Sequence, residues 1–229
     1  MASQWSKTLE EQIISNISST MDALSEITGF SLVFLIATIF SGFQKSEKIE
    51  ILGFEIRTQI ATVVLFGILC GLTFNLTRLL SIVSYLLSQL DASPKLEEAI
   101  IILQTHPWVF NPFSQTSGSL SLLLDNLGLS LLIVAWWLGF HTGFFISRGT
   151  RLSSSISVAS WILSLFYLVL GLAAMMLTID LINEINPETK WIKISGLFLF
   201  TPIGAFGLRR IFKELHRLST QVADAPIES

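Results

Sequence analysis

The chain has 229 residues, of which 51% are hydrophobic and only 14% are charged, and its mean hydropathy is +0.66. Soluble domains carry about 25% charged residues, so a large part of this chain's surface cannot face water. The net charge of −3 gives no indication of nucleic-acid binding, and the single cysteine, Cys70, excludes an intramolecular disulfide and a cysteine-based metal or redox site.

Residues 1–26 are predicted to form an amphipathic helix. Apolar side chains recur there at intervals of three and four, with Ser, Asn, Lys and Glu between them. These side chains are Leu9, Ile13, Ile17, Met21 and Leu24. Such a helix lies at the membrane interface or packs on the bundle, and contact with a partner protein is the alternative.

Five long apolar segments are candidates for membrane-spanning helices. They cover residues 27–44, 58–77, 126–147, 155–180 and 193–210. A hydrocarbon core about 30 Å thick is crossed by about 20 apolar residues in a helix. The last segment is short and is a marginal span, which Lys193 would anchor at its start. We therefore expect an all-α fold, a polytopic transmembrane helical bundle over residues 27–212 with four to five spans and amphipathic interfacial helices.

The segment between the first two spans, residues 44–57, is predicted to form a tight hairpin at the membrane surface, because Ile and Phe alternate there with Lys and Glu. The second span continues as an apolar segment to residue 90, which we expect to project from the membrane as an amphipathic stalk. Arg78 then lies near the exit from the bilayer, since an Arg at the bilayer centre costs roughly 2.5–3.5 kcal/mol.

Residues 91–125 are predicted to form an interfacial loop region. Pro94 begins a short amphipathic helix with Ser93 as its N-cap. The sequence HPWVFNPF at 106–113 places aromatic rings beside two prolines, which suits the headgroup zone. Residues 213–229 form a polar C-terminal tail.

Three polar side chains inside the predicted spans are candidates for a functional site. His141 is the only ionisable residue deep in the third span, and intramembrane ionisable groups are functional candidates. It either bonds a backbone carbonyl or Thr142 as a neutral ring, or senses protons or a ligand. Asn75 and Arg78 lie one turn apart on the second span. They either face neighbouring helices and headgroups or line a water-filled path.

Two G-x-x-x-G patterns are candidates for helix packing, Gly67 with Gly71 and Gly139 with Gly143. Small residues four apart let helix backbones approach closely. We expect them to serve packing within the chain, with contact between copies of the chain as the alternative. No catalytic constellation, metal site or cofactor motif is predicted.

The order of several segments resembles a known family. These segments are I-x-I-L-G-F-E-I at 49–56, HPWVFNP at 106–112 and L-G-x-x-L-L-x-x-x-W-W-L at 127–138. They are similar to the uncharacterised bacterial integral-membrane module that accompanies pentapeptide repeats, over roughly residues 27–150. No pentapeptide repeat occurs in this chain. The resemblance implies the inner membrane of a bacterium or cyanobacterium, and it carries over no functional residue.

The sequence favours a non-enzymatic membrane protein that acts through assembly, as an oligomeric effector, a pore or a scaffold subunit. Its expected partners are membrane lipid and either a further copy or another membrane protein, and no nucleic acid. The alternative is a transporter or channel component with His141, Asn75 and Arg78 along a polar path. A lipid-acting enzyme would need His141, Asp125 and Asp180 at one interface, but Asp125 lies at the opposite end of its span from His141.

The distribution of basic residues predicts a cytoplasmic C-terminus, since Lys and Arg accumulate on that side of the membrane. With five spans, nine Lys and Arg fall on the side of the C-terminus and five on the other. The N-terminus is then outside, and it moves inside if there are four spans. A reporter enzyme fused to Ser229 should be active only where cytoplasmic reporters are active. An external C-terminal reporter would reject this orientation.

Overall fold

The structure is a computed structural model. It describes residues 2–43, 48–51, 54–115, 130, 133–140, 154–188, 190–191, 193–195 and 210. His141, Gly143 and Asp125 lie outside the described residues, as do most of the predicted spans 126–147 and 193–210 and the tail at 213–229.

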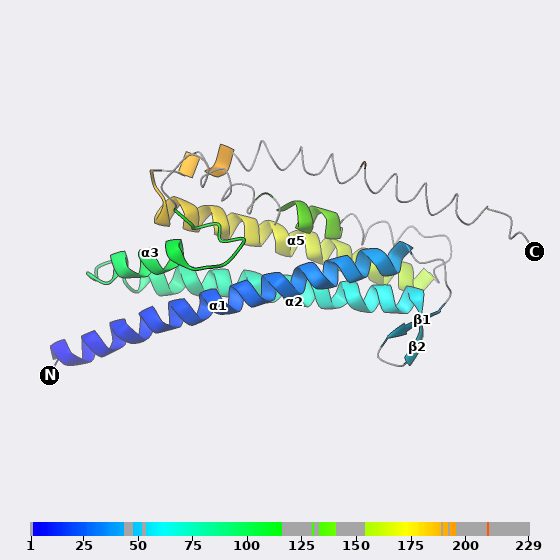
Figure 1. The fold of residues 1–229 in the computed structure, drawn as a ribbon, viewed down its shortest axis with the longest axis horizontal. Helices are drawn as coiled ribbons and strands as arrows, with labels where there is room; N and C mark the ends of the chain where they lie inside the picture. The colour runs from blue at the N-terminus through cyan, green and yellow to red at the C-terminus, as the bar shows by residue number, and fades with distance from the viewer. Residues whose placement is uncertain are drawn as a thin grey trace, which may run out of the picture.

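Three long helices dominate the described part of the chain. They are α1 (Ala2–Phe43), α2 (Thr58–Ser88) and α5 (Ser154–Ile185). They lie side by side along the long axis of the molecule, and α2 packs against both α1 and α5 (Figure 1). The expected helical class is confirmed in these elements.

Each long helix contains a stretch that is long and apolar enough to cross a membrane. These stretches are Thr8–Ile39, Ile60–Ser88 and Ser157–Ile185. Their outer surfaces carry large exposed apolar side chains such as Val33, Val64 and Val169. Such faces are unfavourable in water and suit a lipid environment. The described residues thus provide three candidate spans and do not confirm the expected four to five.

The predicted N-terminal helix and the predicted first span are one continuous helix, α1, with no break near residue 26. Nothing in the sequence stops the helix there, since no proline occurs and Gly29 is a single glycine in open space. The amphipathic stripe packs on the bundle, with Ile17, Met21 and Leu24 fully buried, whereas Leu9 is exposed. This corresponds to the first of the two roles expected for residues 1–26.

The predicted hairpin is confirmed, and it adds two short strands to the expected all-α class. Strands β1 (Lys48–Ile51) and β2 (Phe54–Arg57) pair antiparallel, with Ile49 opposite Ile56 and Ile51 opposite Phe54. The hairpin lies at the end of the bundle away from the N-terminus (Figure 1). The alternation of apolar and polar side chains that predicted the hairpin is the alternation of side chains between the two faces of these strands.

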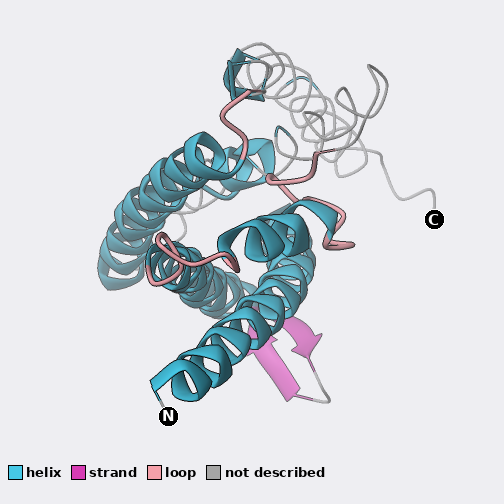
Figure 2. Ribbon diagram, turned by 90° about the vertical axis from the view of Figure 1, so that its left-hand side faces the viewer, coloured by secondary structure: helices cyan, strands magenta, loops and turns pink. Residues whose placement is uncertain are grey.

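A short helix, α3 (Leu96–Thr105), follows α2 at the opposite end of the bundle, where Figure 2 views the molecule end on. The hydroxyl of Ser93 accepts a hydrogen bond from the Lys95 N–H at 3.1 Å, just before α3 begins. Glu97 and Glu98 lie in its first turn, and the hydrogen bond and attraction of Glu98 raise the pKa of Lys95. The helix is thus confirmed, but it begins two residues after the predicted start at Pro94, and Lys95 rather than Ser93 occupies the N-cap position.

Two groups of buried apolar side chains hold the helices together. The loop-end core joins the N-terminal half of α1 to α3 and to the C-terminal halves of α2 and α5. It includes Met21, Leu24, Leu80, Val83, Leu87, Leu103 and Ile182. The predicted stalk is therefore packed on all these helices and does not stand alone. The hairpin-end core contains Leu35, Phe66, Leu69, Cys70 and Tyr167.

Helices α2 and α5 run in the same direction. Cys70 Sγ lies 3.5 Å from the Leu163 carbonyl oxygen, and the Thr77 hydroxyl lies 3.3 Å from that of Leu170. Residues 133–140 are helical and run the opposite way, since Ile133 packs on the loop-end core and Phe140 on the hairpin-end core. Helix α1 also runs opposite to α2 (Figure 1).

Gly171 leaves less space for a side chain than Gly29, Gly67, Gly71 or Gly139. A Cβ atom there would lie 1.5 Å from Trp136 Nε1, and that nitrogen donates a hydrogen bond to the Tyr167 carbonyl oxygen at 3.2 Å. A side chain at Gly171 would displace the indole and break this bond. By contrast, a Cβ atom at Gly29 would meet no atom within 4 Å.

We expect Gly171→Ala to lower the free energy of unfolding by about 1–3 kcal/mol through overpacking. Gly29→Ala is the matched control and should raise it by about 0.5–1 kcal/mol, because alanine favours a helix over glycine. Circular dichroism during thermal unfolding in mild detergent measures both. Equal unfolding midpoints for the two variants would contradict the packing at Gly171.

Candidate functional site

The structure describes two of the three polar residues that the sequence predicted as a group. His141 lies outside the described residues, whereas Asn75 and Arg78 are exposed on α2. In the described part of the chain, neither side chain has a hydrogen-bond or ion-pair partner.

The two G-x-x-x-G patterns differ in what surrounds them. Gly139 is buried, and a Cβ atom there would lie 2.7 Å from the Tyr167 hydroxyl, so this glycine packs within the chain. Gly71 is exposed and Gly67 is partly exposed, and a Cβ atom at either meets nothing within 4 Å. Among the described glycines of the two patterns, Gly67 and Gly71 are therefore the ones for which contact between copies remains an alternative.

Four of these residues form one surface, which we call the α2 stripe: Gly67, Gly71, Asn75 and Arg78. Their spacings of four, four and three residues place them on the same side of a helix. The stripe consists of two glycines followed by an amide and then by a guanidinium. It has no partner among the described residues.

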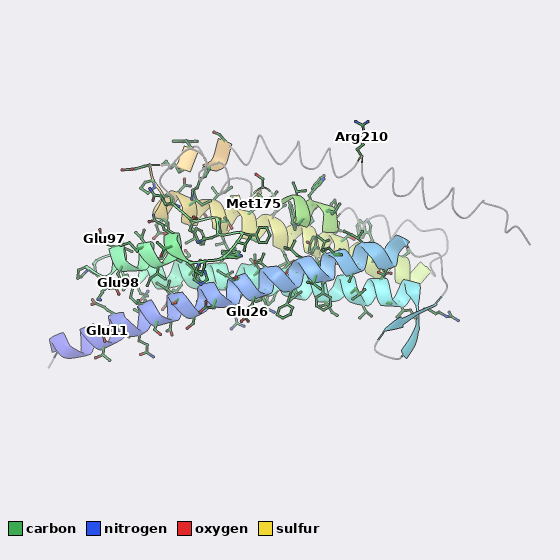
Figure 3. The ribbon with its side chains drawn as sticks, in the orientation of Figure 1. Glu11, Glu26, Glu97, Glu98, Met175 and Arg210 are labelled. Carbon is green, nitrogen blue, oxygen red and sulfur yellow. The ribbon has the colours of Figure 1, made fainter. Side chains whose placement is uncertain are left out.

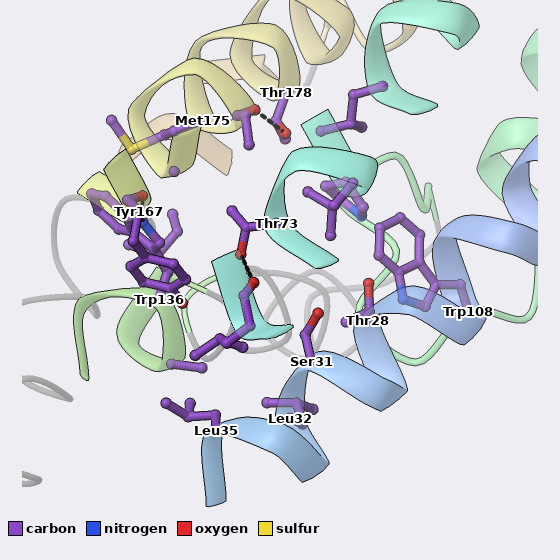
Figure 4. Close-up of a pocket in the computed structure, with 18 of the residues that line it drawn as sticks. Thr28, Ser31, Leu32, Leu35, Thr73, Trp108, Trp136, Tyr167, Met175 and Thr178 are labelled. Carbon is purple, nitrogen blue, oxygen red and sulfur yellow. Dashed lines mark hydrogen bonds between the residues drawn. The ribbon is translucent and has the colours of Figure 1, made fainter. Parts of the chain in front are cut away.

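A second feature is an apolar pocket of about 100 Å³ between the long helices (Figure 4). It is lined by α1, α2, α5, residues 133–136 and the loop after α3. The lining side chains with a hydroxyl group or an indole ring include Thr28, Ser31, Thr73, Trp108, Trp136 and Thr178. The sequence did not indicate this pocket, because its walls come from five separate segments. Neither Asn75 nor Arg78 lines it.

Most polar groups around the pocket are satisfied by their own helix. The hydroxyls of Thr28, Thr73 and Thr178 donate to carbonyl oxygens one turn back, at distances of 2.8, 2.9 and 2.8 Å. Ser31 Oγ and Trp108 Nε1 are different, since both are buried and neither has a hydrogen-bond partner among the described residues. Figure 4 shows Ser31, Thr28 and Trp108 together on one side of the pocket.

Trp108 belongs to the aromatic loop, residues 106–113, which a buried amide holds in shape. Asn111 Nδ2 donates to the carbonyl oxygens of Leu103 and His106, and Asn111 Oδ1 accepts from the Phe113 N–H at 2.9 Å. Asn111 is only 4% exposed, so these bonds are protected from water. The loop is therefore a rigid support for the indole ring.

Two residues far along the chain fasten the same loop to the end of α5. Asn186 is buried, and its Nδ2 donates to the Phe113 carbonyl oxygen at 3.0 Å. Lys193 is 2% exposed, and its ammonium donates to the carbonyl oxygens of Pro112 and Ser114. A buried ammonium is unfavourable unless it is hydrogen-bonded, and these carbonyls meet that need. Lys193, which the sequence predicted to anchor the last segment, thus has its ammonium bound to this loop.

Further polar contacts lie beside the hydrogen bonds that Asn186 and Lys193 make to the loop. Gln104 Nε2 donates to Asn186 Oδ1 at 2.9 Å, and His106 Nε2 lies 3.0 Å from Asp22 Oδ1 on α1. Sequence reasoning missed this network. Its one local signal is that both Asn111 and Asn186 precede a proline, a pair typical of turns.

The described residues contain no group of three or more potential metal ligands. Comparisons with family models, with curated proteins and with solved structures found no match to this chain. The resemblance to the bacterial membrane module therefore stays a prediction.

The hydrogen bond from Asn186 to the aromatic loop can be tested directly. Asn186→Ala leaves the fully buried Phe113 carbonyl oxygen without its donor, which should lower the free energy of unfolding by about 1–3 kcal/mol. Hydrogen exchange at residues 106–113 should accelerate. Asn183→Ala is the matched control, because Asn183 is exposed on the last turn of α5. Equal exchange in the two variants would refute the role of Asn186.

Proposed function

We propose that this protein is a non-enzymatic integral membrane protein that acts by assembling with further copies of itself through the α2 stripe. The observation that carries the proposal is the open surface of α2, where Gly67 and Gly71 precede Asn75 and Arg78. Helix α2 packs against both other long helices, yet this side of it is left without a partner among the described residues.

The chemistry of the stripe favours an identical helix as the partner. Glycines four residues apart allow two backbones to approach, and a polar amide in a lipid environment gains from a hydrogen bond across the interface. Such bonds contribute about 0.6–2 kcal/mol in membranes. Copies inserted in the same orientation around a two-fold axis place each stripe against its equivalent, so Asn75 meets Asn75 of the second copy.

Arg78 is compatible with such a contact. At 1.5 Å per residue, it lies about 30 Å along α2 from Thr58, which is the thickness of a hydrocarbon core. Its guanidinium therefore reaches the headgroups, where water and phosphate separate it from the Arg78 of the second copy. Glu26 on the outer side of α1 supports a boundary at this level, since it is exposed and charged (Figure 3).

Four crossings fit the directions of the helices best. Because α2 and α5 run in parallel, the chain between them must return across the bundle, and residues 133–140 run in that returning direction. The crossings would be residues 27–44, 58–77, 126–147 and 155–180, with 193–210 as the marginal fifth. We place the protein in a bacterial inner membrane, with the basic tail in the cytoplasm.

Native mass spectrometry in mild detergent tests the assembly. We expect an oligomer for the natural sequence, and Gly71→Leu and Asn75→Leu should each shift the population toward monomer by at least several-fold. Gly29→Leu is the control, because Gly29 also has open space beside it but lies on α1. Circular dichroism should show that all three variants keep their helical content, since none of these positions is packed.

Cross-linking in native vesicles removes the influence of detergent. In a Cys70→Ser background, Asn75→Cys should form a disulfide-linked dimer on oxidation. Met176→Cys should not, because Met176 is exposed on α5, away from the stripe. A natural chain that is strictly monomeric by mass spectrometry, together with no cross-linked dimer of the Asn75→Cys variant, would exclude assembly as the mode of action.

A further inference from the structure

The pocket between the long helices has the surroundings of a lipid-binding site. Its walls include Ser31 of α1, Thr73 of α2 and Gly171 of α5, and each belongs to a stretch that is apolar enough to cross a membrane. A pocket of about 100 Å³ is smaller than the sites that hold drug-sized molecules. It is close in size to apolar cavities that hold a single small ring. It therefore suits one acyl-chain segment or one ring.

Two hydrogen-bond donors are left over inside this pocket. Trp108 is 6% exposed, and its indole nitrogen can only donate. A serine in a helix commonly donates to the carbonyl oxygen one turn back, as Thr28 does here, but Ser31 does not. Both groups line the pocket and lack a partner among the described residues. Buried donors in native proteins are nearly always paired, so a ligand of this pocket must offer a hydrogen-bond acceptor to these two groups.

The donors are held in place before any ligand binds. Asn111 and Asn186 fix the aromatic loop that carries Trp108, and Lys193 fastens it to the segment after α5. Ser31 is on a continuous helix. Preorganised donors lose little conformational entropy on binding, which strengthens recognition of a matching acceptor.

We propose that this pocket binds an apolar ligand that carries a carbonyl oxygen, which accepts hydrogen bonds from Trp108 Nε1 and Ser31 Oγ while the apolar part fills the space toward Trp136 and Met175. The ester of a membrane lipid with its acyl chain is the source that fits best. Tryptophan favours the membrane interface, where lipid esters lie, and Ser31 is little more than one turn from the exposed Glu26. A lipid-soluble quinone has the same carbonyl chemistry.

The experiment measures ligand retention by native mass spectrometry on the full chain in dodecyl maltoside, a detergent without a carbonyl group. The probes are a diacyl phosphatidylglycerol, the dialkyl ether analogue with the same chains, and decylbenzoquinone. We expect the diacyl lipid to bind at least several-fold more tightly than the ether analogue. Preferential binding of the quinone would keep the carbonyl site and assign it to that source.

Variants identify the donors. Ser31→Ala and Trp108→Phe should each weaken binding of the diacyl lipid by about threefold to tenfold, the effect of one lost hydrogen bond, and leave the ether analogue unchanged. Thr28→Val is the matched control and should change neither, because its hydroxyl already bonds Leu24. If Trp108→Phe fails to fold, the effect of Ser31→Ala on binding of the diacyl lipid still tests the proposal. Equal binding of ester and ether lipids, with no effect of Ser31→Ala, would overturn the proposal.

Discussion

Helices in lipid gain little from burying apolar side chains against one another, because acyl chains are as apolar as leucine. What remains to hold α5 to its neighbours, α2 and residues 133–140, is close fit and a small number of hydrogen bonds. The fit is visible where Trp136 lies over Gly171 and where Tyr167 lies against Gly139. The pocket and the α2 stripe both depend on this packing, because α2 and α5 form two walls of the pocket and leave the α2 stripe exposed.

The two ends of the bundle differ in the polarity of their exposed surfaces and in the size of their buried cores. At the hairpin end the described helices are apolar on the outside as well as the inside, and Thr and Ser hydroxyls are mostly bonded to their own backbone. At the loop end the exposed faces carry charge, such as Glu11, Glu97 and Glu98 in Figure 3. The loop-end core there is larger and is closed by the network around Asn111 and Asn186. This end is built more like a water-soluble helical protein.

Local patterns in the sequence were enough to locate the long helices, the hairpin at 48–57 and, to within two residues, the short helix α3. These features depend on neighbouring residues, since a helix or a hairpin is specified by periodicity and turn chemistry. The same local reasoning divided α1 in two at residue 26, because a change from an amphipathic to an apolar pattern resembles a boundary. The backbone responds only to caps and breakers, and none occurs there.

The candidate sites were less predictable, because they depend on contacts between distant segments. The Asn186 side chain meets the carbonyl group of Phe113 across 73 positions of the chain, and Gly171 is confined by an indole 35 residues earlier. No spacing rule connects such pairs. The exposure of Gly71 and the unpartnered hydroxyl of Ser31 likewise follow from how α1, α2 and α5 are rotated about their own axes. The sequence identified the α2 glycines but not the side of the bundle they face.

The buried ammonium of Lys193 has a consequence for biogenesis. Pro112, whose carbonyl oxygen it binds, leaves the ribosome about eighty residues before Lys193 does, so the aromatic loop cannot be fastened while the chain is still being made. It waits until α5 has entered the membrane and residues 186–193 have followed. The bonds of Asn111 lie within residues 103–113 and need no such wait, so the loop can take its own shape early in synthesis and be joined to the end of α5 only late.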